Sequence, residues 1–143
     1  MLIGRFGNTS GAPYLEARVS FPRFNLRGLV SFLVDTGADG TVLMPADSQK
    51  LGIDFRSLRN QTKSRGIGGS VIGYGETAVL SFTDRRHIYH YLLTVEISAP
   101  TTHNLRYPSL LGRDILKRWR CVVDASVNKV TFTPRVWDLR QKI

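Results

Sequence analysis

An acidic side chain that directly follows an apolar run is the first feature of this sequence with chemical potential. The run from Phe32 to Val34 predicts a buried strand that ends at Asp35, and Thr36 and Gly37 then form a tight turn. Burial of a lone carboxylate is costly, so Asp35 requires hydrogen bonds, a partner charge or a shared proton. The tripeptide alone is equally compatible with an ordinary turn after a strand, so the choice depends on the rest of the chain.

A glycine-rich stretch at residues 65–70, RGIGGS, is the second such feature. Three glycines around Ile67 do not hold a regular strand well, whereas the residues that follow have strand composition. We therefore expect the tip of a long hairpin that carries one apolar side chain. A phosphate-binding loop is the weaker alternative, because no Lys-Ser/Thr pair follows and no helix begins there.

The third feature is the stretch SLLGRDIL at residues 109–116. Leu110 and Leu111 predict a short buried strand, and Gly112 permits a close approach of another backbone segment. A short helix is expected next, with Ile115, Leu116 and Trp119 on one side. An ordinary strand-to-helix transition with a solvent-facing Arg113 is the alternative interpretation.

Short strands make up most of the rest of the chain. Outside the three segments above, a helix is predicted only at 45–51, where Pro45 stands at a helix start and Gly52 at a helix stop. Turns are expected at 22–27, 84–86 and 125–128, and a loop at 99–108. The expected strands cover residues 14–20, 28–34, 77–82, 87–97, 121–124 and 129–133.

Length and composition indicate one globular domain. The chain has 143 residues, of which 42% are apolar and 22% are charged. We expect a single domain over residues 1–143, with a core at about 14–133 and a peripheral polar tail at 134–143. No segment approaches the length of a membrane span, and the first residues lack the pattern of a secretory leader, so a soluble cytoplasmic protein is expected.

The charge balance is strongly basic, with 20 Lys and Arg against 11 Asp and Glu and a net charge of +9. These charges lie in loose clusters, one between Arg56 and Arg65 and one between Arg113 and Arg120. Neither cluster has the aromatic interleaving of a nucleic-acid-binding module. The pattern favours a solvated basic surface, and nucleic acid is not expected to be the main partner.

Cys121 is the only cysteine, so no internal disulfide can form. We expect it to be a small buried hydrophobe in the strand at 121–124. The three histidines, at positions 87, 90 and 103, have spacings that suit no common metal site. No metal and no other cofactor is therefore expected.

The segments FLVDTGADGTVL, RGIGGS and SLLGRDIL, in this order and at these separations, resemble the retroviral-type aspartic proteases, or retropepsins. The later segment LLGRDILKRWRCVVDASVNKVTF resembles the cellular and bacterial members, such as the protease domain of the DNA-damage-inducible ubiquitin-shuttle proteins. The resemblance runs from about Tyr14 to Phe132. It implies an all-β closed acid-protease barrel with a flap hairpin and one or two short helices, functional as a symmetric homodimer. It further implies an aspartic endopeptidase that cleaves extended polypeptides and needs no cofactor.

The resemblance also implies roles for single residues. Asp35 would be the catalytic aspartate, with Thr36 and Gly37 fixing its geometry and Thr36 bonding to its counterpart in a second subunit. Gly112 would pack against the catalytic turn, and Arg113 would pair with Asp39. The residues implied to bind substrate are Leu33, Ala38, Asp39, Gly66, Ile67, Gly68, Gly69 and Leu111, with Ile67 closing over the peptide at the flap tip. Gly40 and Asp114 depart from the best-known viral pattern, which has an acidic residue and Asn at these positions.

The chemistry itself requires two chains. Hydrolysis by this route needs two carboxylates around one water, and two like charges about 3 Å apart do not both ionise easily, so the pair shares a proton. The sequence contains one Asp-Thr-Gly, so a symmetric homodimer has to supply the second carboxylate. Two other functions remain open at this point: a catalytically silent peptide-binding or dimerisation module, and a basic nucleic-acid-binding protein.

Overall fold

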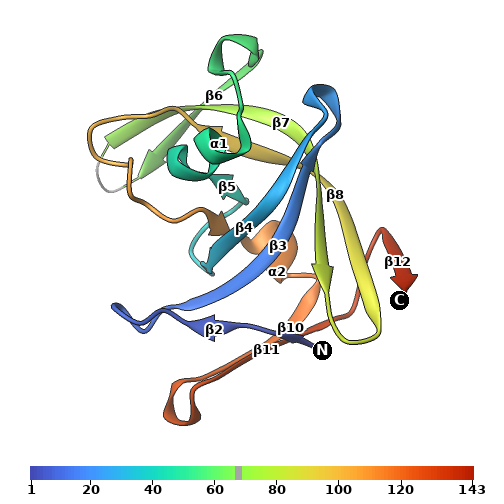
Figure 1. Cartoon of the computed structure of the whole chain (residues 1–143). Coiled ribbons are helices and arrows are strands. Elements are labelled where there is room, and N and C mark those ends of the chain that lie inside the picture. The colour runs from blue at the N-terminus through green and yellow to red at the C-terminus, as the bar shows by residue number, and fades with distance from the viewer. Residues whose placement is uncertain (67–68) are drawn as a thin grey trace.

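Twelve strands and two short α-helices form the described part of the chain. The computed structural model describes residues 1–66 and 69–143 (Figure 1). The strands are β1 (Leu2–Ile3), β2 (Arg5–Phe6), β3 (Pro13–Phe21), β4 (Leu26–Val34), β5 (Val42–Leu43), β6 (Asn60–Gly66), β7 (Gly69–Thr83), β8 (His87–Ser98), β9 (Leu110–Leu111), β10 (Trp119–Asp124), β11 (Lys129–Pro134) and β12 (Leu139–Lys142). The helices are α1 (Pro45–Leu51) and α2 (Arg113–Leu116), and 3₁₀ turns occupy 22–24, 55–57 and 125–127.

The main sheet closes on itself. Its strands pair in the order β8–β5–β9–β4–β3–β7, and β7 pairs with β8 to complete the circuit. β6 extends the sheet from β7, β12 pairs with the start of β8, and a smaller sheet has the order β1–β11–β10 (Figure 1). The closed all-β barrel with short helices that the sequence predicted is confirmed.

The hairpin of β3 and β4 delivers Asp35 to the end of a buried strand. Apolar side chains alternate along β3, which is the period expected for a strand with one face in the core. The fully buried members on this hairpin are Leu15, Ala17, Val19, Phe21, Val30 and Phe32. The connection between the strands is a 3₁₀ turn that Asn25 ends in the left-handed conformation, with φ 52°.

Helix α1 has the predicted ends. Pro45 lies in its first turn, and Gly52 ends it with φ 86°, a conformation that favours glycine. The helix packs against β4 at Gly28, where a Cβ atom would lie 2.4 Å from Cδ2 of Leu51. Among the described residues, neither α-helix is long and apolar enough to cross a membrane.

An aromatic cluster around Trp119 forms one part of the core. The indole packs edge-on against Phe82 at 4.8 Å between ring centroids and lies near Tyr91 and Phe132 at 5.9 and 5.5 Å. Its Nε1–H donates a 2.7 Å hydrogen bond to the Tyr91 hydroxyl. The prediction that Trp119 lies on the short helix is wrong, because α2 ends at Leu116 and Trp119 is the first residue of β10.

One residue near the end of the chain, Cys121, differs from its predicted burial. Cys121 is exposed, and not buried as predicted, because β10 lies at the edge of the smaller sheet with only β11 beside it. The tail beyond Pro134, expected to be polar and peripheral, contains the strand β12. All four residues of β12 are exposed, while Trp137 packs against Tyr89 with 5.5 Å between ring centroids.

The Trp119–Tyr91 hydrogen bond gives a test of the core. Burial raises the pKa of Tyr91, so its hydroxyl stays neutral and accepts from the indole. Tyr91→Phe should lower the free energy of unfolding by about 1–3 kcal/mol, because it leaves the buried indole N–H without its acceptor. Denaturant titration at fixed protein concentration measures the change.

Tyr89→Phe is the matched control, since the Tyr89 hydroxyl lies at a long 3.5 Å from Asp84. It should change the free energy of unfolding by less than about 0.5 kcal/mol, as substitutions away from strong contacts do. Equal effects of the two substitutions would contradict the assigned role of Tyr91.

Candidate active site

Asp35 lies where two parallel strands end together. Residues 33 and 34 of β4 pair in parallel with Leu110 and Leu111 of β9, and the amide of Asp35 donates to the Leu111 carbonyl at 3.0 Å. The amide of Gly37 donates to Oδ1 of Asp35 at 2.9 Å. The half-buried carboxylate is thus oriented by its own turn, and the turn is anchored to β9.

Arg113 also contacts the turn that carries Asp35. Its Nη1 donates to the Thr36 carbonyl at 2.7 Å, and its Nη2 forms the expected ion pair with Asp39. The Arg113 and Asp39 side chains are 47% and 96% exposed, so the pair does not have the partly buried setting of a strong ion pair. In the single chain, Arg113 positions the Thr36 carbonyl more than it stabilises the fold.

Beneath the turn, Gly112 lies directly on Gly40. A Cβ atom at Gly112 would be 2.4 Å from the carbonyl carbon and oxygen of Gly40, so only glycine fits without a shift of backbone. Gly112 thus packs against Gly40, in the segment that follows the turn at Asp35. The amide of Arg113 also donates to the Ala38 carbonyl at 2.9 Å, which joins the two segments by their backbones.

Sequence reasoning missed the polar pair Thr41 and Asp114. The backbone amide and the hydroxyl of Thr41 both donate to the Asp114 carboxylate, at 2.9 and 2.8 Å, and Thr41 is only 1% exposed. The Thr41 hydroxyl also accepts from the Gly112 amide at 3.3 Å. Asp114, noted in the sequence only as a departure from the viral pattern, therefore fastens the segment that follows the Asp35 turn to α2.

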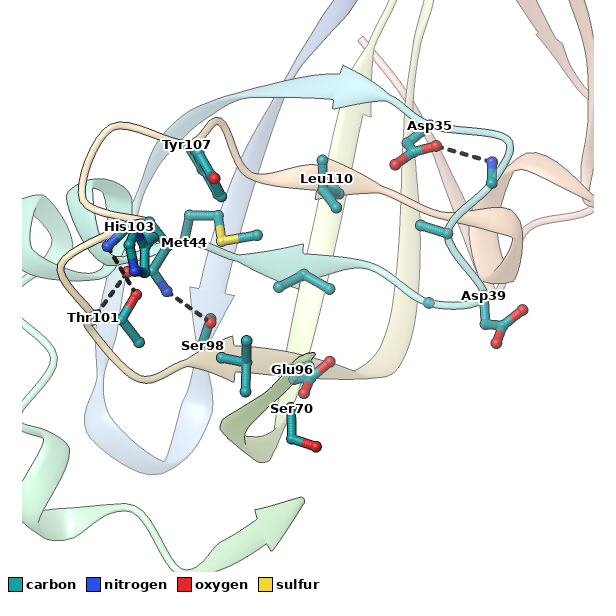
Figure 2. Close-up of a pocket in the computed structure, with 16 residues that line it drawn as sticks. Asp35, Asp39, Met44, Ser70, Glu96, Ser98, Thr101, His103, Tyr107 and Leu110 are labelled. Carbon is teal, nitrogen blue, oxygen red and sulfur yellow. Dashed lines mark hydrogen bonds between the residues drawn. The ribbon is translucent and has the colours of Figure 1, made fainter. Parts of the chain in front are cut away.

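A cleft of about 850 Å³ opens beside Asp35 (Figure 2). It is lined by Asp35, Gly37, Ala38, Asp39, Gly40, Val42, Met44, Ser70, Val71, Glu96, Ser98, Thr101, His103, Asn104, Tyr107 and Leu110. The structure therefore brings Asp35 together with three other predicted site residues, Gly37, Ala38 and Asp39. The remaining lining residues are Gly40, Met44 and residues of β5, β7, β8, β9 and the loop at 99–108, and sequence reasoning had not assigned them to the site.

Two predicted substrate-binding leucines do not line the cleft. Leu111 is fully buried, and Leu33 is half-buried on the paired strand β4. Leu110 faces the cleft instead, because successive side chains of a strand point to opposite sides and Leu111 takes the core side. Thr36 is exposed and lies outside the cleft lining.

The glycine-rich stretch forms a hairpin, as its composition predicted. β6 and β7 pair in antiparallel register from Asn60 opposite Gly75 to Gly66 opposite Gly69. Ser70 and Val71 of β7 line the cleft, so the hairpin stands at its wall. The predicted tip residues Ile67 and Gly68 lie outside the described residues.

Comparison with known proteins supports the resemblance. The family model for Aspartyl protease matches residues 22–83, which include Asp35, Thr36 and Gly37. A retropepsin-like aspartic protease from Rickettsia conorii has 23% identity and a TM-score of 0.60, covering 91% of this chain and 95% of its own. EIAV protease complexed with the inhibitor HBY-793 has 24% identity and a TM-score of 0.53, covering 78% and 90%. No curated protein sequence matches.

The predicted resemblance to the retropepsin-like aspartic proteases is thus confirmed in fold and in the matched family model. The same findings support the prediction of an aspartic endopeptidase. They leave the roles of the individual site residues to be argued from the geometry above.

The contact between Gly112 and Gly40 is open to a direct test. Gly112→Ala should lower the free energy of unfolding by about 1–3 kcal/mol, because the new methyl group overlaps backbone atoms that cannot rotate away. The φ of −95° at Gly112 suits any residue, so the effect is steric. Thermal or denaturant unfolding measures it.

Gly40→Ala serves as the control on the other side of the same contact. Its Cβ atom would lie 3.6 Å from Oδ2 of Asp114, an ordinary van der Waals distance, and its backbone is outside the left-handed region. The expected loss is below about 0.5 kcal/mol. If Gly112→Ala were equally harmless, the close backbone approach would have no structural weight.

Proposed function

We propose that this chain, which shares the fold of the retropepsin-like aspartic proteases, is an aspartic endopeptidase whose active site is completed by a second copy of itself. The observation that carries the proposal is the position of Asp35, held by backbone hydrogen bonds at the end of a core strand and opening onto a large cleft. The other acidic residues that line the cleft have other contacts. Asp39 pairs with Arg113, and Glu96 accepts a hydrogen bond from Thr62.

The second carboxylate comes from the second subunit. With one Asp-Thr-Gly in the chain, a two-fold axis beside the turn brings two Asp35 side chains together. Thr36 is exposed in the single chain, and its side chain then bonds to Thr36 of the other copy. The exposed Arg113–Asp39 pair contacts the same turn and becomes more buried when the copies meet.

In this site a water molecule lies between the two Asp35 carboxyl groups. The ionised carboxylate takes a proton from the water as it attacks the peptide carbonyl, and the protonated carboxyl group donates to the carbonyl oxygen. The substrate is an extended polypeptide that lies in the cleft and forms main-chain hydrogen bonds along its walls. The hairpin of β6 and β7 covers the peptide and excludes water, with Ile67 over the bound residues.

Asp35→Asn tests the proposed function. The variant should lose cleavage of an unstructured polypeptide by at least about a thousandfold, because the amide cannot exchange a proton with the water. It should keep the sedimentation of a folded dimer in analytical ultracentrifugation. An excess of the variant mixed with wild-type protein should also suppress activity, since each mixed dimer has one carboxylate.

Addition of the same excess of wild-type protein is the control for the mixing experiment and should raise cleavage. Undiminished turnover by Asp35→Asn, or no suppression after subunit exchange, would refute the shared dyad. If wild-type protein and Asp35→Asn both bind peptide and neither cleaves it, the protein would instead be a catalytically silent peptide-binding module.

Arg113→Ala separates positioning of the site from stability. At protein concentrations low enough to keep the chain monomeric, the free energy of unfolding should change by no more than about 1 kcal/mol, because the Asp39 pair is exposed in the single chain. The kcat for peptide cleavage should fall at least about tenfold with little change in KM, because the Thr36 carbonyl loses its donor and the catalytic turn loosens.

Arg56→Ala is the matched control, since Arg56 pairs with Asp54 at 3.3 Å on the surface and does not line the cleft. It should leave both the free energy of unfolding and kcat nearly unchanged. An Arg113 variant that behaves in the same way would show that Arg113 is only a surface charge.

A further inference from the structure

Glu76 is a carboxylate in an apolar row of β7. Ala78, Leu80 and Phe82 follow it at alternate positions of the strand and are fully buried. Glu76 occupies the next position of the same row and is only 7% exposed. Burial of an unpaired charge in such a row would be strongly unfavourable, so the side chain needs a partner at a fixed place.

Arg23, in the 3₁₀ turn between β3 and β4, is that partner. Its Nε donates to both carboxylate oxygens of Glu76, at 3.1 and 3.2 Å, and its Nη2 donates to Oε1 at 2.7 Å. The guanidinium also lies over the ring of Phe24, 4.1 Å from the centroid. Because several donors and an aromatic face fix its planar group, Arg23 holds Glu76 in one orientation.

The ion pair lies where β7 changes partners. On one edge, β7 pairs with β6 over residues 69–75 and with β3 over residues 79–81, so residues 76–78 separate the two neighbours. Nη2 of Arg23 also donates to the carbonyl of Ser57 at 2.9 Å, in the segment that leads into β6. Arg23 thus binds both strands of the β6–β7 hairpin at its base.

The β6–β7 hairpin depends on this base for its position. β6 lies at the border of the sheet and pairs, within the described residues, only with β7 (Figure 1). β7 pairs with β8 from Gly73 onward, so Ser70 and Val71, which line the cleft, have β6 as their strand neighbour. A strand advances about 3.3 Å per residue, so a small rotation at Glu76 displaces Val71, up to about 17 Å along β7, by a larger amount.

We propose that Arg23 and Glu76 are positioning residues that set the place of the β6–β7 hairpin over a bound peptide. The inference rests on the proposed function and extends it. Neither residue lines the cleft, so the pair acts through the two strands and not by contact with the substrate. The hairpin holds the peptide main chain alike before and during cleavage, so its displacement should raise KM more than it lowers kcat.

The double variant Arg23→Met with Glu76→Leu separates positioning from stability. It removes both charges together, and an apolar pair of similar volume is often as stable as the buried ion pair that it replaces. Its melting temperature should therefore stay near that of wild type. For a peptide that wild-type protein cleaves, KM should rise at least about tenfold while kcat changes by less than about threefold. An unchanged KM in the folded variant would overturn the proposal.

Arg23→Lys is a milder form of the same test. It keeps a positive charge beside Glu76, but lysine has no planar fork that binds two carboxylate oxygens and the Ser57 carbonyl together. KM should rise at least about threefold. Should the double variant fail to fold, this variant decides, and a wild-type KM would then overturn the proposal.

Arg118→Gln is the matched control. The Arg118 side chain is 30% exposed, close to the 32% of Arg23. It likewise combines an ion pair, to Asp138 at 3.2 Å, with a position 5.6 Å from the ring centroid of Tyr91, and these partners lie outside the hairpin. KM should remain that of wild type. A rise equal to that of the Arg23 variants would assign the effect to general destabilisation and overturn the proposal.

Amide hydrogen exchange of the uncleaved protein makes the inference independent of turnover. In both Arg23 variants the amides of β6 should exchange at least about tenfold faster than in wild type, because the strand loses its anchor, while those of β3 and β4 keep wild-type rates. Unchanged exchange in β6 would overturn the inference. If β6 responds as expected but wild-type protein cleaves nothing, the proposed function fails and the positioning of the hairpin stands.

Discussion

The parallel pairing of β4 with the two residues of β9 is the constraint on which the site depends. It places the end of a buried strand beside Gly112, and only the absence of a side chain there allows the backbones of Gly112 and Gly40 to touch. The hydrogen bonds from Thr41 to Asp114 and from Arg113 to Thr36 then lock the turn that carries Asp35. These contacts hold the half-buried carboxylate of Asp35 in one position, as the proposed preorganised catalysis requires.

The turn that carries Asp35 has several exposed groups in the single chain. Thr36, Asp39 and Arg113 are all exposed, although each is directed by specific hydrogen bonds or by an ion pair. The electrostatic energy of a surface ion pair rarely exceeds the entropy cost of ordering its side chains. The second copy that we propose would lower the local dielectric constant around these groups and so strengthen their contacts. The ordered but exposed groups of this turn are therefore consistent with the proposed dimer.

Much of the fold could be predicted because local signals coincide with tertiary ones. Pro45 and Gly52 bound α1, alternation marks β3, and the glycines at 66–69 mark a hairpin, all of which depend on a few adjacent residues. The errors have tertiary causes. Leu110 faces the cleft and Leu111 faces the core, and only the position of β9 in the barrel decides which of the two does so. The exposure of Cys121 depends on the lack of a second neighbour for β10.

Glu96 belongs to the same class of missed residues, because nothing in its local sequence indicates that β8 runs beside β5.

The final strand shows how a surface segment affects association between molecules. β12 satisfies the backbone of β8 from His87 to His90, and it presents Arg140 and Lys142 at the new border of the sheet. Positive charges at such a border disfavour the addition of strands from other molecules. Strand β12 thereby limits the growth of the sheet at this border.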